Sequence, residues 1–135
     1  MLTCLSLDCH VYQVLKAMNE FRSFQVAFRG IITASRSEKH MKFHLLAAVS
    51  TIAAALWLKF STVEWIVLIL VISGMLALEM INTAIEKLVD LIEPEWNELA
   101  GKIKDIAAGA CLVYACGAAV IGCILYVPKL LAWFG

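Results

Sequence analysis

Three long apolar stretches constrain the fold of this chain more than any other feature. They run over residues 45–58, 65–81 and 106–127. A helix needs about 20 apolar residues to cross the hydrocarbon core of a bilayer, and the first two stretches reach that length only with their apolar neighbours. Hydrophobic residues make up 62% of the chain, above the usual content of a soluble domain. The sequence therefore predicts an all-α integral membrane protein with three transmembrane helices, at about 43–60, 64–86 and 105–127.

Lysine and arginine residues predict the orientation. Of the eleven, six precede the first span and three lie between the second and the third, whereas Lys59 and Lys129 lie on the other side. In membrane proteins the cytoplasmic loops carry the excess of positive charge. We therefore expect a multi-pass protein whose N-terminus and residues 87–105 lie in the cytoplasm.

The residues before the first span predict two further parts. Residues 1–16 show no clear period, so we expect an N-terminal tail there and one membrane domain over residues 17–135. Over residues 21–36, apolar side chains interleave with arginines, which is typical of a basic amphipathic helix on the inner membrane surface. A helix that packs on the end of the bundle fits this pattern equally well.

Polar residues interrupt the second apolar stretch. At about 100° per residue, five of them return to one face of a helix. They are Glu79, Asn82, Thr83, Glu86 and Asp90. A carboxylate near the bilayer centre costs on the order of 3 kcal/mol, and such residues usually face a bundle interior, a cavity or a partner. We therefore predict that Glu79 and Glu86 are functional.

The third span carries small residues and cysteines. Alanines and glycines over residues 107–119 give this helix small faces that permit close approach of another helix. Cys111, Cys116 and Cys123 belong to no metal or redox motif, and we expect them to pack as small apolar residues. The chain has no Walker-type glycine loop and no dinucleotide fingerprint. Any nucleotide site must therefore be built differently.

Two carboxylates, an amide and a downstream lysine suit phosphoryl transfer from ATP to a lipid alcohol. One carboxylate would take the hydroxyl proton, others would hold Mg²⁺, and a lysine would neutralise phosphate charge. We expect Lys104 and Asp105 at the start of the third helix, where backbone N–H groups attract anions. Two other classes stay open. A proton-coupled transporter would use Glu79 and Glu86 as a relay, and a non-catalytic assembly protein would use the polar face for helix association.

Two motifs carry a family resemblance. They are EMINTAIEKLVD at residues 79–90 and KDIAAGA at residues 104–110, supported by Glu38 and Gly30. With them, residues 20–130 resemble the prokaryotic diacylglycerol kinase and undecaprenol kinase family of small trimeric integral-membrane lipid kinases. The resemblance implies a homotrimeric helical bundle in the bacterial inner membrane, with active sites at subunit interfaces. It implies ATP-dependent phosphorylation of undecaprenol or diacylglycerol at the cytoplasmic face, with Mg²⁺ as cofactor and no nucleic-acid partner.

The resemblance also implies a role for each matching polar residue. Glu79 would be the general base at the lipid hydroxyl, and Asn82 would orient Glu79 or the phosphoryl group. Glu38 and Glu86 would bind the Mg²⁺ that bridges the phosphates of ATP. Asp90 would support the site.

Further ATP contacts are implied for Lys104 and Asp105 and for the turn formed by Glu95, Trp96 and Asn97. This sequence has Trp96 and Asn97 where tyrosine and histidine are usual.

The choice of lipid depends on fewer residues. His44, Pro94 and residues 127–130 look more like the undecaprenol kinase branch than like the proteobacterial diacylglycerol kinases. We therefore expect undecaprenol as the substrate, with diacylglycerol close behind. His40 replaces an asparagine that is common in relatives, and no role is assigned to it.

Overall fold

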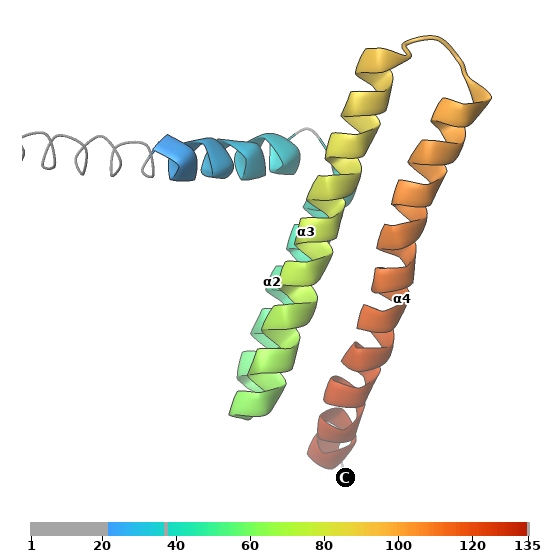
Figure 1. The fold of residues 1–135 in the computed structure, drawn as a ribbon. Helices are drawn as coiled ribbons and strands as arrows, with labels where there is room; N and C mark the ends of the chain where they lie inside the picture. The colour runs from blue at the N-terminus through green and yellow to red at the C-terminus, as the bar shows by residue number, and fades with distance from the viewer. Residues whose placement is uncertain (1–21, 37, 135) are drawn as a thin grey trace, which may run out of the picture. The chain divides into compact units, whose positions relative to one another are not determined.

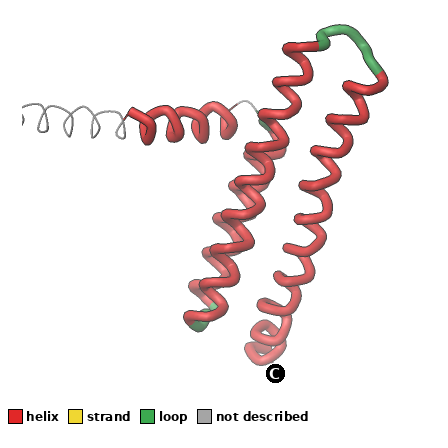
Figure 2. The backbone as a smooth tube through the Cα atoms, viewed as in Figure 1, coloured by secondary structure: helices red, strands yellow, loops and turns green. Residues whose placement is uncertain are grey.

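The computed structural model describes residues 22–36 and 38–134, and its regular structure is helical throughout (Figures 1 and 2). One helix covers residues 22–36, and three more follow: α2 (Lys39–Trp57), α3 (Thr62–Ile92) and α4 (Glu98–Phe134). Within the described ranges there is no strand, which confirms the all-α prediction. The expected tail over residues 1–16 lies outside the described residues.

The chain divides into two compact units, Met1–Ser37 and Glu38–Gly135. In the helix over residues 22–36, Phe24, Phe28 and Ile31 follow the spacing of one helix face, and all three are exposed. The predicted amphipathic helix is therefore present. Its position on a membrane surface stays a prediction.

A tight corner ends α2. Lys59 has a φ of 51°, in the left-handed region. The N–H groups of Lys59 and Phe60 donate to the carbonyl oxygens of Leu56 and Ala55, at 3.3 and 3.1 Å. This pattern is a Schellman motif, and its usual apolar contact is made by Phe60 with Ala55.

The start of α3 is closed by a capping box. The Ser61 N–H donates to Glu64 Oε2 at 2.6 Å, and the Glu64 N–H donates to Ser61 Oγ at 3.5 Å. From α4, Lys129 Nζ pairs with Glu64 Oε2 at 3.1 Å and lies 5.2 Å from the centre of the Phe60 ring. One side chain of α4 thus fastens the corner between α2 and α3.

Buried residues repeat every seven positions along α2 and α3. They are Met41, Ala48 and Ala55 on α2, and Leu68, Met75 and Asn82 on α3. A seven-residue repeat keeps one helix face against its neighbour. Asn82 therefore occupies a position that this repeat normally gives to an apolar residue, and packing carries its amide into the interior.

A glycine of α3 allows α4 to come close. The Tyr114 hydroxyl donates to the carbonyl oxygens of Leu70 and Val71, at 3.1 and 3.2 Å, and a Cβ at Gly74 would overlap the Tyr114 side chain. Two glycines of the small face predicted on α4 make no such close contact within the described part of the chain. At Gly109 and Gly117 an added Cβ would meet nothing within 4 Å.

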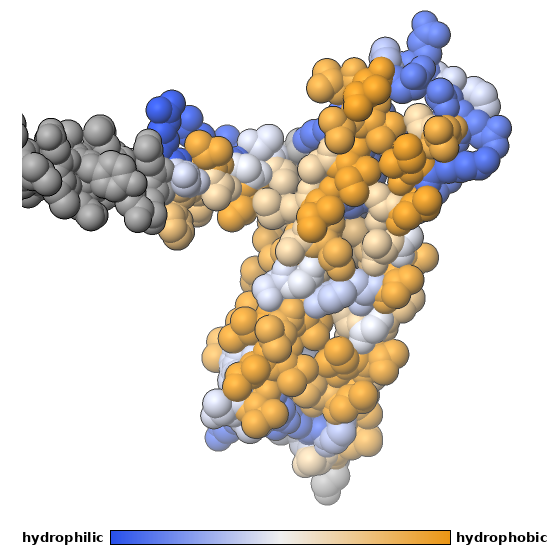
Figure 3. Space-filling model, in the orientation of Figure 1, coloured by the Kyte–Doolittle hydropathy of each residue, from blue (hydrophilic) through white to orange (hydrophobic). Residues whose placement is uncertain are grey.

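Two helices of the described chain, α3 and α4, are long and apolar enough to cross a membrane. The 31 residues of α3 span about 46 Å, and the 37 of α4 span more, so both extend beyond a hydrocarbon core of about 30 Å. α2 has 19 residues, ends at Trp57 and does not meet the same criterion, so the span expected at 43–60 stays a prediction. Hydrophobic residues cover the sides of these helices, and hydrophilic ones gather over the connection from α3 to α4 (Figure 3).

Candidate active site

A group of buried polar side chains lies on the face of α3 that packs in the bundle. Glu79, Asn82 and Thr83 are 5%, 8% and 6% exposed. They continue the face that begins with Leu68 and Met75. The structure thus brings together three of the five polar residues that sequence periodicity placed on one stripe, and it buries them.

The amide of Asn82 is held at one end only. Its Nδ2 donates to Glu86 Oε1 at 3.0 Å, whereas its buried Oδ1 has no hydrogen-bond partner among the described residues. A buried polar atom without a partner costs about 1–3 kcal/mol. The Oδ1 atom is therefore an acceptor that a bound group can satisfy.

Cys111 of α4 faces this group. It is 9% exposed, and its thiol lies close enough to the Glu79 carboxylate for the two groups to interact. Sequence reasoning treated Cys111 as a packing residue only. Cys111 lies four positions after Ala107, which is also buried, so the two share one face of α4, but the sequence alone does not show that this face packs toward α3.

An ion pair joins α3 to α4 beyond Glu86. Lys104 Nζ lies 2.8 Å from Asp90 Oδ1, with the two side chains 37% and 63% exposed. An exposed pair of this kind contributes about 0–1 kcal/mol, so it orients the lysine more than it stabilises the fold. Asp105 is exposed, and the structure does not bring it to the buried group.

Glu38 reaches α3 next to Glu86. It precedes α2, and its Oε1 lies 3.2 Å from Nζ of Lys87. Mg²⁺ is usually bound by one or two carboxylates together with water and phosphate oxygens. Glu38, Glu86 and the unpartnered Oδ1 of Asn82 are oxygen ligands of this kind, so they fit a metal that is carried with ATP. Among residues 22–36 and 38–134, no group of three or more His, Cys, Asp or Glu could hold a metal ion.

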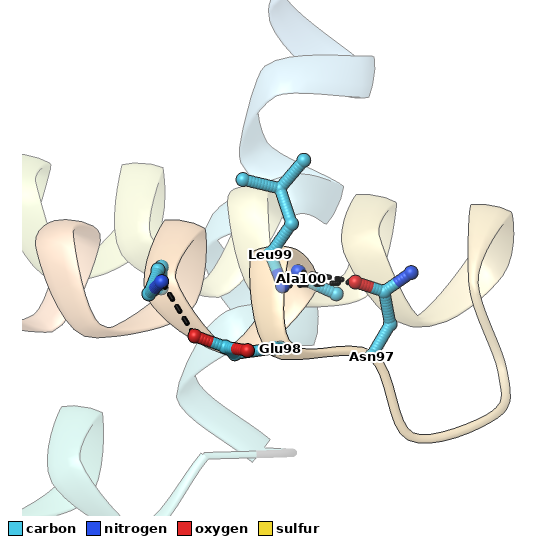
Figure 4. Close-up of polar contacts among 5 residues, drawn as sticks. Asn97, Glu98, Leu99 and Ala100 are labelled. Atoms are coloured by element: carbon cyan, nitrogen blue, oxygen red, sulfur yellow. Dashed lines mark hydrogen bonds and ion pairs between the residues drawn. The ribbon is translucent and has the colours of Figure 1, made fainter.

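The turn predicted to contact ATP begins α4. Asn97 Oδ1 accepts hydrogen bonds from the N–H groups of Leu99 and Ala100, at 2.8 and 3.3 Å, and so caps the helix (Figure 4). Trp96 is 90% exposed, and Glu95 is exposed as well. These residues lie apart from the buried group.

The prediction that the third helix begins at Lys104 is wrong, because α4 begins at Glu98. The cap at Asn97 starts the helix, and a Lys102–Glu98 pair at 2.6 Å follows on its exposed side. The backbone N–H groups at residues 104 and 105 therefore lie inside the helix. They are not the anion-attracting donors that the sequence suggested.

An apolar cavity of about 380 Å³ lies between the three helices of the bundle. Its α3 wall ends with Met75 and Leu76, and the next buried residue of that helix is Glu79. Its α4 wall ends with Ala115, one turn from Cys111. The Glu79 carboxylate and the Cys111 thiol thus lie one turn beyond the end of the cavity. Its volume falls in the range of small-molecule pockets.

Comparisons with known proteins find similar proteins along most of this chain. Residues 25–126 match the model of the prokaryotic diacylglycerol kinase family. The chain is 42% identical over 110 residues to undecaprenol kinase of Bacillus subtilis (strain 168), covering 82% of this chain and 89% of the relative. It is 36% identical over 117 residues to diacylglycerol kinase of Synechocystis sp., covering 86% of this chain and 67% of the relative. For diacylglycerol kinase of Escherichia coli (strain K12), the identity is 29% over 99 residues, covering 73% and 81%.

Proposed function

Because the chain belongs to the prokaryotic diacylglycerol kinase family and is thus a membrane lipid kinase, we propose that it phosphorylates a lipid alcohol with Mg-ATP. Undecaprenol is the proposed acceptor, with undecaprenyl phosphate as the product. Diacylglycerol, which would give phosphatidate, is the second candidate. The observation that carries the proposal is the buried Glu79 carboxylate next to the end of an apolar cavity.

Glu79 acts as the general base of the proposed reaction. The lipid chain occupies the apolar cavity, and the hydroxyl at its head reaches Glu79. As the hydroxyl oxygen forms a bond to the γ-phosphorus, its proton passes to Glu79. The bond from the γ-phosphorus to the oxygen that bridges it to the β-phosphorus breaks, and ADP leaves with that oxygen.

The polar residues beyond Glu79 bind the nucleotide. Asn82 directs its free Oδ1 into the site while Glu86 holds its Nδ2. Glu86 and Glu38 would hold Mg²⁺, which would neutralise phosphate charge when ATP is bound. Lys104, which Asp90 orients, supplies a positive charge to the phosphates of ATP. Asp105 and the turn over residues 95–97 provide outer contacts to ATP.

The relatives favour undecaprenol, and the cavity suits the hydrocarbon chain of either lipid. The relative named for that lipid is 42% identical, against 36% and 29% for two named for diacylglycerol. The cavity lining is largely apolar, so it selects a hydrocarbon chain and only a small head group.

The proposed assembly is a homotrimer in the bacterial inner membrane, with the Glu38 and Asp90 end in the cytoplasm. Apolar side chains such as Leu112, Val113 and Val120 of α4 are 60% or more exposed in the single chain. Lipid and neighbouring subunits would cover them. The excess of lysine and arginine near the Glu38 end supports this orientation.

Transfer of labelled phosphate from Mg-ATP tests the proposal. The full chain is assayed in mixed micelles with undecaprenol or diacylglycerol, and a sample without either lipid gives the blank. We expect label on both lipids and faster transfer to undecaprenol. Label on neither lipid would contradict the kinase. It would favour the proton-coupled transporter, which transfers no phosphate to lipid.

A further inference from the structure

A second pocket lies at the other end of the bundle, where α2 ends and α4 reaches its last turns. It has a volume of about 350 Å³ and is lined by Trp57, Leu58, Lys59, Lys129, Ala132 and Trp133. Two tryptophans and two lysines are thus four of its six lining residues. The proposed phosphoryl transfer uses none of them.

The two tryptophans form one wall of this pocket. Trp57 of α2 and Trp133 of α4 meet edge to face, with ring centroids 4.8 Å apart and an angle of 62° between the rings. Their side chains are still 56% and 59% exposed. Tryptophan is enriched where apolar chains meet lipid head groups, because one part of the ring is apolar and the N–H is polar.

The charges of this pocket do not cancel. Lys129 pairs with Glu64 at 3.1 Å, and its side chain is 27% exposed. Lys59 is exposed, and the structure gives it no ion pair among the described residues. Among the described residues at this end of the bundle, two lysines and one glutamate leave one positive charge in excess.

The strained backbone conformation of Lys59 indicates that its side chain has a function. Lys59 occupies the left-handed position of the Schellman motif, with a φ of 51°, where glycine is the usual residue. A residue with a Cβ costs about 1–2 kcal/mol in that conformation. Glycine would suit the corner better, so the strain suggests that the lysine is needed for another reason.

We propose that this pocket binds the phosphate-bearing head group of an anionic phospholipid. Lys59 pairs with the phosphate, and the rings of Trp57 and Trp133 pack against the glycerol and the first methylenes of the chains. Free phosphate offers the same charge, but it would leave the exposed rings unused. Next to the pocket, Leu56 and Leu131 are 66% and 69% exposed, which continues the apolar surface for the lipid chains.

Tryptophan quenching by brominated lipids tests this site in the full chain. Trp96, at the other end of α3, is changed to Phe so that the signal comes from the end with the pocket. The protein is placed in phosphatidylcholine vesicles that contain either dibrominated phosphatidylglycerol or dibrominated phosphatidylcholine. One lysine near a membrane surface favours anionic lipid by about fivefold. We therefore expect phosphatidylglycerol to associate about fivefold more tightly than phosphatidylcholine.

Variants of Lys59 separate binding from folding. Lys59→Gly should abolish the preference while raising the unfolding temperature, because glycine relieves the strain. Lys59→Arg should retain the preference, as should Lys102→Gln, which removes the same charge from the other end of the bundle. Equal quenching by the two lipids, or a preference that survives in Lys59→Gly, would overturn the proposal. Binding of inorganic phosphate to the wild type in lipid-free detergent that is lost in Lys59→Gly, together with equal quenching by the two lipids, would assign the pocket to free phosphate and overturn the lipid assignment.

Discussion

The buried amide of Asn82 has an acceptor oxygen that a bound group could satisfy. The seven-residue repeat of α3 would place an apolar side chain there, and Leu68 and Met75 obey it. Instead the amide is 8% exposed, its Nδ2 is held by Glu86, and its Oδ1 has no partner among the described residues. Packing alone would favour leucine. Under the proposed function, a ligand such as Mg-ATP would satisfy the free acceptor.

Replacement of Asn82 by aspartate should therefore reduce phosphate transfer by about 100-fold or more. The change preserves shape but removes the donor to Glu86 and places a second carboxylate 3.0 Å from the first. The initial rate with Mg-ATP and undecaprenol is the readout. Ser73→Ala, an exposed hydroxyl of the same helix that bonds its own backbone, is the matched control. Transfer at the control rate by a folded Asn82→Asp protein would exclude this role.

The buried group could be predicted from sequence, but its neighbours could not. Periodicity placed Glu79, Asn82 and Thr83 on one face because that requires only the helical repeat. The contact of Cys111 with Glu79 depends on how two helices are rotated about their axes. No local pattern reports that rotation. The free Oδ1 of Asn82 likewise depends on packing from more than one helix.

Among the elements, α4 differs most from its prediction. The sequence predicts a polar cytoplasmic connection that ends where the third helix starts, at Lys104. The asparagine cap at residue 97 decided the outcome, because its side chain satisfies two N–H groups of the first turn. A polar helical turn outside a bilayer is stable when it is capped and paired, so polarity alone does not mark a loop.

Asn97→Ala should lower the free energy of unfolding by about 1 kcal/mol, because it removes the cap. Asn97→Asp should restore that stability, since aspartate caps equally well. If Asn97 also lies near ATP, the added carboxylate will raise the KM for ATP in Asn97→Asp. Thermal unfolding in detergent and ATP-dependent rates measure the two effects. An Asp variant as unstable as the Ala variant would exclude the cap as the main role of Asn97.

The contact between α3 and α4 gives a second prediction for an element. Gly74→Ala should destabilise the fold by about 1–3 kcal/mol, because the new methyl group would overlap Tyr114. Gly117→Ala, where an added Cβ meets nothing within 4 Å, should leave the single chain at least as stable. Gly74→Ala combined with Tyr114→Ala should lose less stability than the two single losses predict. Fully additive losses would show that the overlap is not the cause.

The bundle of α2, α3 and α4 has two ends that differ in chemistry. One end holds the corner, its capping box and the pocket of Trp57 and Trp133, and the other holds the acidic residues from Glu79 to Asp90 and Lys104. The all-helical class and two helices long and apolar enough to cross a membrane followed from hydropathy, because long apolar runs have few alternatives in a bilayer. The positions of the turns were harder to predict from the sequence, because a single capping residue or a strained residue such as Lys59 determines where a helix ends.

Phosphate transfer by Glu79→Gln tests the central claim most directly. The substitution retains the shape of the side chain but removes the proton acceptor, so transfer from Mg-ATP to undecaprenol should fall by about 100-fold or more. ATP binding and the folded state should persist, because the glutamine still fills the buried position. Glu98→Gln, the same change at an exposed pair, should transfer phosphate at the wild-type rate. Wild-type transfer by a folded Glu79→Gln protein would contradict the account.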